Sequence, residues 1–405
     1  MRIHTASVSR YASAAGWAAL YVAINALVVV KQAGRMGLSA PAAAAAYVAL
    51  AGGLLALAVA FTSRRPSPGR TAPDAAGRGR RAGIATALVA GVATVLLVWA
   101  QSRVDPYTLQ VDRWSAIHNF LEHLLAGEYP YAARTHLGGY GSPFPVWQLV
   151  HLPFYLLFHN VGLSSVVALA LFVHSTARAR GGRAALAAAL LLYASPAVVY
   201  EVTVRSDLMA NFLAVGALIN YLAAAGFNAR RRPVTAGVIG GLLLATRWSA
   251  VVPWGLWLLM PFVQMGGRAR VRLVVAAVLT FAAAFAPFLL WDGAMLLSFD
   301  YNPFVLQSRQ GNVSDLLLFV PLGVALGWWT GGRAQRAMGA SALMLTLVVA
   351  GSFVHDMSVR GDWDQLLGGT YDLTYFHMGL PFCVAALAGC LAPAARQRDA
   401  LSKKS

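Results

Sequence analysis

The sequence predicts an all-α, polytopic membrane protein with about 11–13 transmembrane helices. Two observations carry this prediction. Of the 405 residues, 58% are hydrophobic and only 12% are charged, whereas soluble domains carry about a quarter charged residues. Apolar runs long enough to cross about 30 Å of hydrocarbon also recur from the first residues to the last. A protein of this composition belongs in a lipid bilayer.

The expected spans follow one another with short polar connections. They lie near 12–30, 41–61, 83–101, 161–177, 184–200, 208–226, 234–247, 249–264, 273–291, 313–330, 337–354 and 375–393. The pair between 234 and 264 is short, which leaves a broken helix open. The run 143–158 contains Pro153, and we expect it to lie in the membrane interface instead of crossing.

The distribution of charge predicts the orientation. If 143–158 does not cross, 23 of the 32 Lys and Arg residues fall on one side of the membrane. By the positive-inside rule that side is cytoplasmic, and both termini lie there. The basic clusters are Arg2, Arg10, Arg64–Arg81, Arg178–Arg183, Arg230–Arg232, Arg268–Arg272, Arg333–Arg336 and Arg396–Lys404. All acidic residues except Asp74 and Asp399 then lie on or near the outer face. Because acidic residues do not set topology, their segregation indicates chemistry on that face.

We expect one transmembrane domain over residues 1–405. It comprises an N-terminal helix pair with a cytoplasmic linker (1–82), a core (83–393) with a long outer loop (102–160), and a cytoplasmic tail (394–405). The basic residues are dispersed through short inner loops, which disfavours nucleic-acid binding despite a net charge of +17. The Ala, Gly and Arg richness is typical of a bacterial protein, which predicts the inner membrane of a bacterial cell envelope.

The outer loop begins with an amphipathic helix over about 112–126. Its apolar residues recur at intervals of three and four, and Ser115, His118, Asn119 and Glu122 form the opposite face. Such a helix is predicted to lie along the membrane surface with its aromatic side towards lipid. Gly127 ends it, and Glu128 to Tyr131 turn the chain. Asp112 is thereby placed at headgroup level.

This loop resembles the first outer loop of the GT-C superfamily of glycosyltransferases. The resemblance rests on Asp112, on Gly127-Glu128-Tyr129-Pro130-Tyr131 about fifteen residues later, and on Ser142-Pro143-Phe144-Pro145. Members of this family are multispanning enzymes that use polyprenyl-phosphate sugars. In them an acidic residue soon after an early helix is the catalytic base, and a G-x-x-P-Y-like turn follows an amphipathic helix. Two spans precede the helix that leads into the loop here, whereas the simplest members have one.

The resemblance implies an inverting hexosyl- or pentosyltransferase, such as a mannosyltransferase. It would move a sugar from a polyprenyl-phosphate donor to a lipid or glycan acceptor on the outer face, with Asp112 as general base. Independently, glycosyl transfer to a hydroxyl requires a carboxylate that accepts the proton. The departing lipid phosphate requires cationic donors, for which arginine is well suited.

Two arginines are the expected phosphate ligands. Arg205 lies in the second outer loop, "YEVTVRSDLMANF", which also contains Glu201, Ser206, Asp207 and Asn211. Helix capping by Ser206 and Asp207 with an outward-reaching Arg205 is the structural alternative. Arg247 lies in an apolar stretch and should face a polar cavity, an acid or a lipid phosphate. We expect Asp112, Arg205, Asp207 and Arg247 to share one outward cavity.

Further residues are secondary candidates. They are Asp207, Glu128, Glu122, His118, Asn211 and Tyr131. The segments "FDYNPFVLQSRQGN" (Asp300, Asn302, Gln307, Arg309) and "YDLTYFHMGLPF" (Asp372, Tyr375, His377) either complete the site or anchor the chain in the interface. No metal ligand is assigned. Binding of a divalent cation such as Mg²⁺ or Mn²⁺ stays open, with either His118 and Glu122 or Asp112 and Asp207 as its ligands.

Two other functions remain open on the sequence. A transporter or flippase would line an aqueous path with the outer acids, although these acids cluster in loops and no clear internal repeat is present. A scaffold protein would use the Trp-rich loops for docking alone. An enzyme requires the polar residues to converge near one lipid-accessible place.

Overall fold

The computed structural model describes residues 2–62, 72–298, 301–308, 313–361 and 371–392. Within these ranges the protein is all-helical, and its one isolated β-bridge joins Arg134 and Tyr140. The α-helices are α1 (Arg2–Gln32), α2 (Ala40–Thr62), α3 (Ala72–Ser102), α4 (Arg113–Ala126), α5 (Pro145–Val150), α6 (Leu152–Phe158), α7 (Leu163–Arg180), α8 (Gly182–Tyr193), α9 (Pro196–Thr203), α10 (Leu208–Ala224), α11 (Pro233–Leu244), α12 (Val251–Val263), α13 (Gly267–Leu297), α14 (Pro303–Ser308), α15 (Val313–Thr330), α16 (Ala334–Arg360) and α18 (Leu380–Leu391). Short 3₁₀ turns are η1 (Ala33–Met36), η2 (Pro106–Thr108), η3 (Pro130–Ala132), η4 (Trp248–Ala250) and η5 (Leu373–Met378).

The protein is a polytopic membrane protein, but fewer helices than expected are long enough to cross a bilayer. Six helices in the described ranges are long and apolar enough, or eight if each of two bent helix pairs counts as one span. Three more expected spans, α10, α11 and α12, are apolar helices of only 17, 12 and 13 residues. The predicted count of 11–13 is therefore too high for spans of full length. The break left open between 234 and 264 is present, between α11 and α12, whereas hydropathy did not predict the bend between α8 and α9, where the sequence stays largely apolar.

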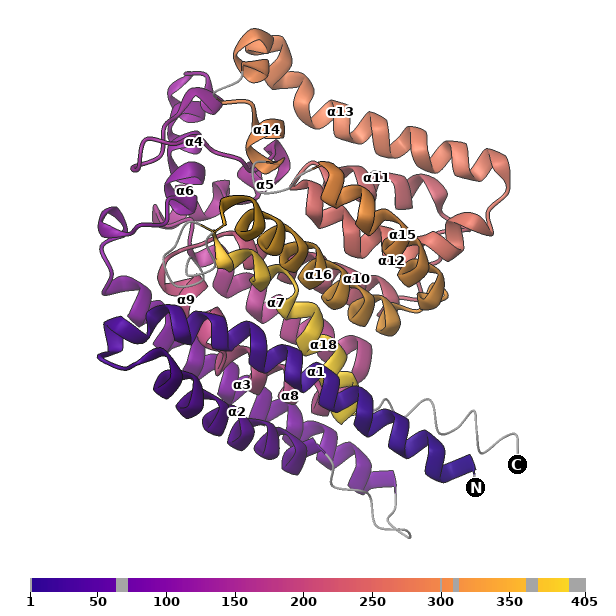
Figure 1. Ribbon diagram of the computed structural model, residues 1–405. Coiled ribbons are helices and arrows are strands. Elements are labelled where there is room, and N and C mark those ends of the chain that lie inside the picture. Colours follow the sequence, from indigo (N-terminus) through magenta and orange to yellow (C-terminus); the bar gives the residue numbers. More distant parts are fainter. Residues whose placement is uncertain (1, 63–71, 299–300, 309–312, 362–370, 393–405) are drawn as a thin grey trace.

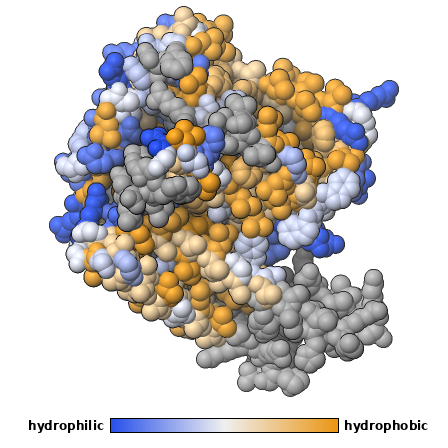
Figure 2. All heavy atoms as spheres, in the orientation of Figure 1, coloured by the Kyte–Doolittle hydropathy of each residue, from blue (hydrophilic) through white to orange (hydrophobic). Residues whose placement is uncertain are grey.

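The polar outer segments gather at one end of the helical bundle. In Figure 1, α4, α5 and α6 lie together at the upper left, whereas the start of α1 and the end of α18 lie towards the lower right. The sides of the bundle are apolar, and Figure 2 shows hydrophobic residues spread over much of the face that is turned to the viewer. On α13 alone Val271, Val278, Leu279 and Leu290 are each more than half exposed. An apolar surface of this extent suits contact with lipid.

Helix α13 is held to the bundle by a close approach to α11. A Cβ atom added at Gly237 would lie 2.2 Å from the Leu273 carbonyl oxygen, and one at Gly241 would lie 2.4 Å from that of Ala277. Glycines four residues apart allow two helix backbones to touch, as in small-xxx-small contacts between membrane helices. The end of α11, where Arg247 follows, is fixed by this contact.

Helix α4 confirms part of the expectation for the outer loop. It ends at Ala126, and Gly127 caps it in the left-handed region with φ 76°. Its apolar side, however, is covered by protein. Trp114, Ile117 and Phe120 are all buried, and the Phe120 ring packs 5.0 Å from Tyr131 and 5.8 Å from Phe288 of α13. The expected orientation with this aromatic side in lipid is wrong, because the turn after Gly127 and α13 cover that side instead.

The run 143–158 forms two short helices, α5 and α6, of six and seven residues. Neither is long enough to cross alone. Together with α7 they make a pair bent by 114°. The backbone amides of Phe144 and Val146 donate to the carbonyl oxygens of Thr246 and Ala245, at 3.1 Å each. This contact docks α5 against the end of α11 and brings Trp147 to the start of α10.

Candidate functional site

An ionic network occupies the loop end of the bundle, and Arg113 lies at its centre. The Arg113 Nη2 atom is 2.5 Å from Asp372 Oδ2, and Nη1 donates to Ser206 Oγ at 3.2 Å and lies 4.0 Å from Glu201 Oε1. The guanidinium also lies over the Tyr375 ring, 5.1 Å from its centroid. One side chain from the first turn of α4 thus ties together α9, the start of α10 and η5.

Glu201 and His377 form a second buried pair within this network. Their Oε1 and Nδ1 atoms are 2.7 Å apart, and the two side chains are 2% and 1% exposed. The other carboxylate oxygen of Glu201 accepts from the Met209 backbone amide at 3.4 Å. Residues 176 positions apart in the sequence are therefore fixed against each other at one point.

Asp207 and Arg247 form a third buried pair, and its geometry follows from two helix ends. Asp207 precedes α10, and Arg247 is an extended residue between α11 and η4. The Asp207 Oδ2 atom accepts from Arg247 Nη2 at 2.5 Å and from Trp147 Nε1 at 2.7 Å. Both charged side chains are almost completely buried, at 2% and 6% exposure. Of the three environments expected for Arg247, the structure shows the acid.

Several buried acceptor atoms around this third pair have no hydrogen-bond partner among the described residues. They are Oδ1 of Asp207, Oδ1 of Asn211 one turn further along α10, and Nε2 of His151. His151 Nδ1 lies 2.7 Å from the Trp147 carbonyl oxygen, which can only accept, so Nδ1 is the donor and Nε2 is the acceptor of the neutral ring form. Water molecules are the natural donors to such atoms.

Asp112 lies beside this network with a different environment. It immediately precedes α4 but makes no side-chain cap, so its carboxylate is not used to hold the helix. Oδ2 accepts from Thr135 Oγ1 at 2.8 Å, and a Cβ atom added at Gly139 would lie 3.2 Å from the same oxygen. The side chain is half-buried. Among the described residues no contact engages Oδ1, which leaves one carboxylate oxygen available.

Arg205 differs from the other arginines near the site. It adopts the left-handed region with φ 55°. Its Nη2 atom makes only a 3.5 Å contact with the Val104 carbonyl oxygen, and no carboxylate of the described ranges lies within ion-pair distance. Burial lowers the pKa of Arg205, and the more distant Asp105 opposes that shift. The half-buried guanidinium has no anionic partner in the described chain.

The secondary candidate residues lie in different environments. Glu122 and Glu128 are exposed, and Glu128 lies 3.2 Å from His123. The His118 ring packs 4.9 Å from Tyr155, and burial lowers the pKa of His118 below its ordinary value. Tyr131 is buried and donates to the Pro143 carbonyl oxygen at 3.4 Å. No group of three or more His, Cys, Asp or Glu side chains that could hold a metal ion occurs in the described part of the chain.

The structure therefore brings Asp207 and Arg247 into direct contact, while Asp112 and Arg205 each adjoin in sequence a residue of the Arg113–Ser206 hydrogen bond. No hydrogen bond or ion pair among the described residues joins Asp112 to Arg205, Asp207 or Arg247, so a shared cavity for all four residues stays a prediction. Sequence reasoning missed Arg113 and Trp147. The signal for Arg113 was its position next to Asp112. Trp147 gave no signal, because an indole in an apolar run is typical of an interfacial anchor.

Comparisons with known proteins do not assign this chain: no family model, no curated protein and no solved structure matches it.

Proposed function

We propose that this protein is an integral membrane glycosyltransferase of the GT-C type. It moves a hexose or pentose, such as mannose, from a polyprenyl-phosphate donor to a lipid or glycan acceptor. The observation that carries the proposal is the half-buried Asp112, whose carboxylate has one oxygen held by Thr135 and one available, at the loop end of an apolar helical bundle. A lipid-borne substrate reaches such a place from the bilayer.

Asp112 is the general base of the proposed reaction. The acceptor hydroxyl attacks the anomeric carbon, the bond from that carbon to the lipid-phosphate oxygen breaks, and its electron pair leaves with the phosphate. Asp112 takes the hydroxyl proton as the new bond forms. The Thr135 hydrogen bond fixes Oδ2 and leaves the proton-accepting role to Oδ1.

Arg205 is the proposed ligand of the departing phosphate. Arg113 and Arg247 already face Glu201, Asp207 and Asp372, so these five side chains carry one net negative charge when ionised. The two arginines of that network are already paired with carboxylates, whereas the Arg205 guanidinium makes no ion pair with a carboxylate of the described residues. The role of Arg247 is then to position Asp207 and the start of α10.

A transporter or flippase is the competing function. It would require charged groups along a path between the two ends of the bundle. Arg113, Glu201, Asp207, Arg247 and Asp372 all lie at or next to helix ends in the same region of the fold. This grouping favours chemistry at one surface over passage through the bundle.

The decisive experiment uses the purified full-length protein and a panel of polyprenyl-phosphate sugars with lipid and glycan acceptors. We expect release of polyprenyl phosphate together with a glycosylated acceptor for at least one donor, and loss of both in Asp112→Asn. Movement of a lipid-linked sugar across reconstituted vesicles without any transfer product would instead support the flippase.

The proposal also fixes an orientation. The loop end faces outward from the inner membrane of a bacterium, and both termini are cytoplasmic, because that placement obeys the positive-inside rule. Reporter fusions after Ser63 and after Ala132 should therefore report opposite sides. If both reported the same side, the proposed outer-face reaction would be refuted.

A further inference from the structure

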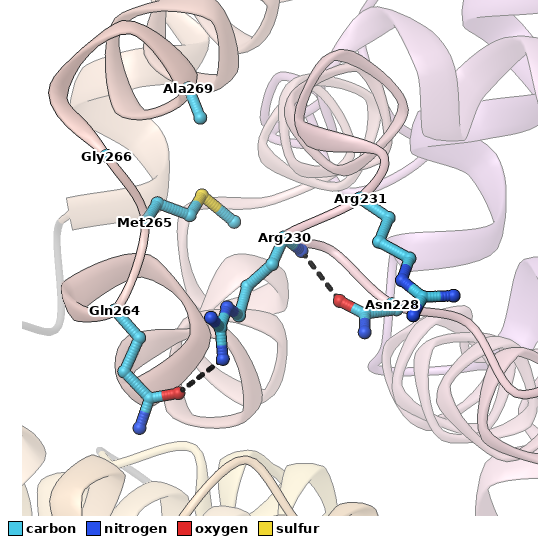
Figure 3. A pocket seen from close by; sticks show the side chains of 7 residues that line it. All are labelled: Asn228, Arg230, Arg231, Gln264, Met265, Gly266 and Ala269. Carbon is cyan, nitrogen blue, oxygen red and sulfur yellow. Dashed lines mark hydrogen bonds between the residues drawn. The ribbon is translucent and has the colours of Figure 1, made fainter.

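A basic cavity lies at the end of the bundle remote from Asp112. It has a volume of ≈ 410 Å³ and is formed by the turn between α10 and α11 and the turn between α12 and α13 (Figure 3). Its lining residues are Asn228, Arg230, Arg231, Gln264, Met265, Gly266 and Ala269. Helix α10 has 17 residues and so separates this cavity from Asp207 by about 25 Å. That distance is close to the thickness of the hydrocarbon layer.

The side chains of the cavity are arranged for an anion. Arg230 reaches across to Gln264, with Nη1 donating to Oε1 at 3.2 Å, and its backbone amide is held by Asn228 Oδ1 at 3.0 Å (Figure 3). These contacts fix the first arginine without neutralising it. The guanidinium of Arg231 has no hydrogen-bond partner in the described chain, and no lining residue is acidic.

The surrounding charge is uncompensated. Residues 208–291 contain no Asp or Glu, yet this stretch carries three arginines in the turn between α10 and α11 (Arg230, Arg231 and Arg232) and three in the first two turns of α13 (Arg268, Arg270 and Arg272). None of the six lies within ion-pair distance of a carboxylate in the described ranges. Arg230 and Arg231 line the cavity itself, and the repulsion between two like charges at one site is relieved when an external anion neutralises them.

The backbone contributes to the same place. Helix α13 begins at the cavity, and Gly266 precedes it with open space where a side chain would be. The amides of Gly267 and Arg268 open the helix and have no backbone acceptor in the described chain. Amides at the start of a 31-residue helix favour an anion, and the glycines allow its oxygens to approach.

We propose that this cavity binds the phosphate group of an anionic lipid headgroup. The cavity lies where apolar α12 ends and apolar α13 begins, at headgroup depth of the leaflet opposite to Asp112. Both arginines line this cavity, and α13 begins beside it, so a headgroup phosphate there meets positive charge and the start of a helix. The inference does not rest on sugar transfer, so failure of one proposal leaves the other unaffected.

The test titrates the purified full-length protein in neutral detergent with dihexanoyl-phosphatidylglycerol, and native mass spectrometry counts the bound lipid. Dihexanoyl-phosphatidylcholine is the zwitterionic comparison, and glycerol 1-phosphate and inorganic phosphate are the soluble comparisons. We expect one tightly held phosphatidylglycerol. In Arg230→Gln/Arg231→Gln its affinity should fall roughly thirtyfold, because each arginine near an anionic headgroup contributes about a factor of five.

The matched control is Arg333→Gln/Arg336→Gln, which removes two exposed arginines from the α15–α16 turn at the same end of the bundle. It should retain the lipid. Arg230→Lys/Arg231→Lys keeps the charge and should bind within about threefold of the parent, which also shows that the two turns still fold. If glycerol 1-phosphate displaced the lipid at an equal concentration, the cavity would be a phosphate site, but its ligand would be a soluble phosphate and not a lipid headgroup.

Equal losses in the two glutamine pairs would overturn the proposal, because general attraction by basic residues does not depend on which turn carries them. Equal affinity for phosphatidylcholine, or no retained phosphate ligand in the parent protein, would overturn it as well.

Discussion

Two carboxylates near the loop end of the bundle, those of Asp207 and Asp112, differ in their burial and in their hydrogen-bond partners. Asp207 is 2% exposed and receives Arg247 and Trp147 on one oxygen. Asp112 is half-buried, is held by Thr135 alone, and has a free oxygen. A buried carboxylate with a cationic partner is needed for folding, because either charge alone would be costly to bury. A carboxylate with an unused oxygen at an accessible place can exchange a proton with a substrate.

Arginines near the site show the same contrast. Arg247 is paired and buried, whereas Arg205 has no anionic partner in the described chain. We therefore expect variants at Asp207 and Arg247 to lower stability, and variants at Asp112 and Arg205 to lower turnover while the protein stays folded. Four substitutions test this division.

The largest effect is expected for Arg247→Leu. This change leaves the Asp207 carboxylate buried without its cation, and breaking a buried ion pair costs about 3–5 kcal/mol. Thermal unfolding in detergent should show a clearly lowered Tm. Asp207→Asn combined with Arg247→Leu removes both charges and should recover part of the loss. An unchanged Tm in the single variant would mean that the pair is not needed for the fold.

Asp112→Asn should produce the largest loss of activity with little change in stability. Asparagine keeps the size and can still accept from Thr135, but it cannot take a proton. Turnover should fall by on the order of a hundredfold or more, equivalent to about 2.7 kcal/mol in the activation barrier. Asp74→Asn is the control and should be silent: the sequence assigned Asp74 to the cytoplasmic linker, and the structure places it in the first turn of α3, at the end of that helix away from the 102–160 loop. If Asp112→Asn transferred sugar at a near-normal rate, Asp112 would not be the general base, and Asp207 would be the next candidate.

Trp147→Phe should weaken the Asp207 pair without removing it. The substitution deletes the Nε1 donor to Asp207 Oδ2 and keeps most of the aromatic volume. A hydrogen bond to a charged group contributes about 1.5–3 kcal/mol, so the decrease in Tm should be smaller than for Arg247→Leu. If Trp147→Phe changed the KM for the donor and left Tm unchanged, Trp147 would do more than support the Asp207 pair.

Arg205→Lys should give the smallest effect of the four. An ammonium keeps the charge but cannot bind a phosphate through two parallel hydrogen bonds, so the KM for the donor should rise by about tenfold with Tm unchanged. The lysine must also adopt φ near 55°, which only a few per cent of residues other than glycine do. Arg134→Lys, on the exposed part of the same outer loop, controls for the change in side chain. Equal KM values for Arg205→Lys and the parent would exclude Arg205 as the phosphate ligand.

The sequence predicted what depends on local pattern. The bounds of α4 and its end at Gly127 follow from periodicity and a glycine C-cap, and both agree with the structure. The cost of an unpaired arginine in an apolar stretch correctly indicated that Arg247 needs a polar or anionic partner. An arginine's charge implies that it has a partner but does not identify it, so phosphate and Asp207 could not be distinguished in advance.

Contacts between distant segments could not be predicted from the sequence. The burial of Phe120 depends on Phe288, which lies 168 positions further along the chain, and the Glu201–His377 pair joins α9 to η5. The bend of 64° between α8 and α9, within the expected span 184–200, was also not predicted, because the sequence stays largely apolar on both sides of it. These features follow from tertiary packing, which no single segment encodes.

The close contact of Gly237 and Gly241 with α13 has a consequence for biosynthesis. Helix α11 has 12 residues and spans about 18 Å, less than the hydrocarbon layer, and arginines flank both of its ends. It is a poor substrate for insertion by itself. Helix α13 is made some thirty residues later, is long enough to cross, and offers its backbone carbonyl groups to those glycines. Helix α11 should therefore settle in the bilayer only after α13 has left the ribosome, so the ion pair of Arg247 with Asp207 is completed late in synthesis.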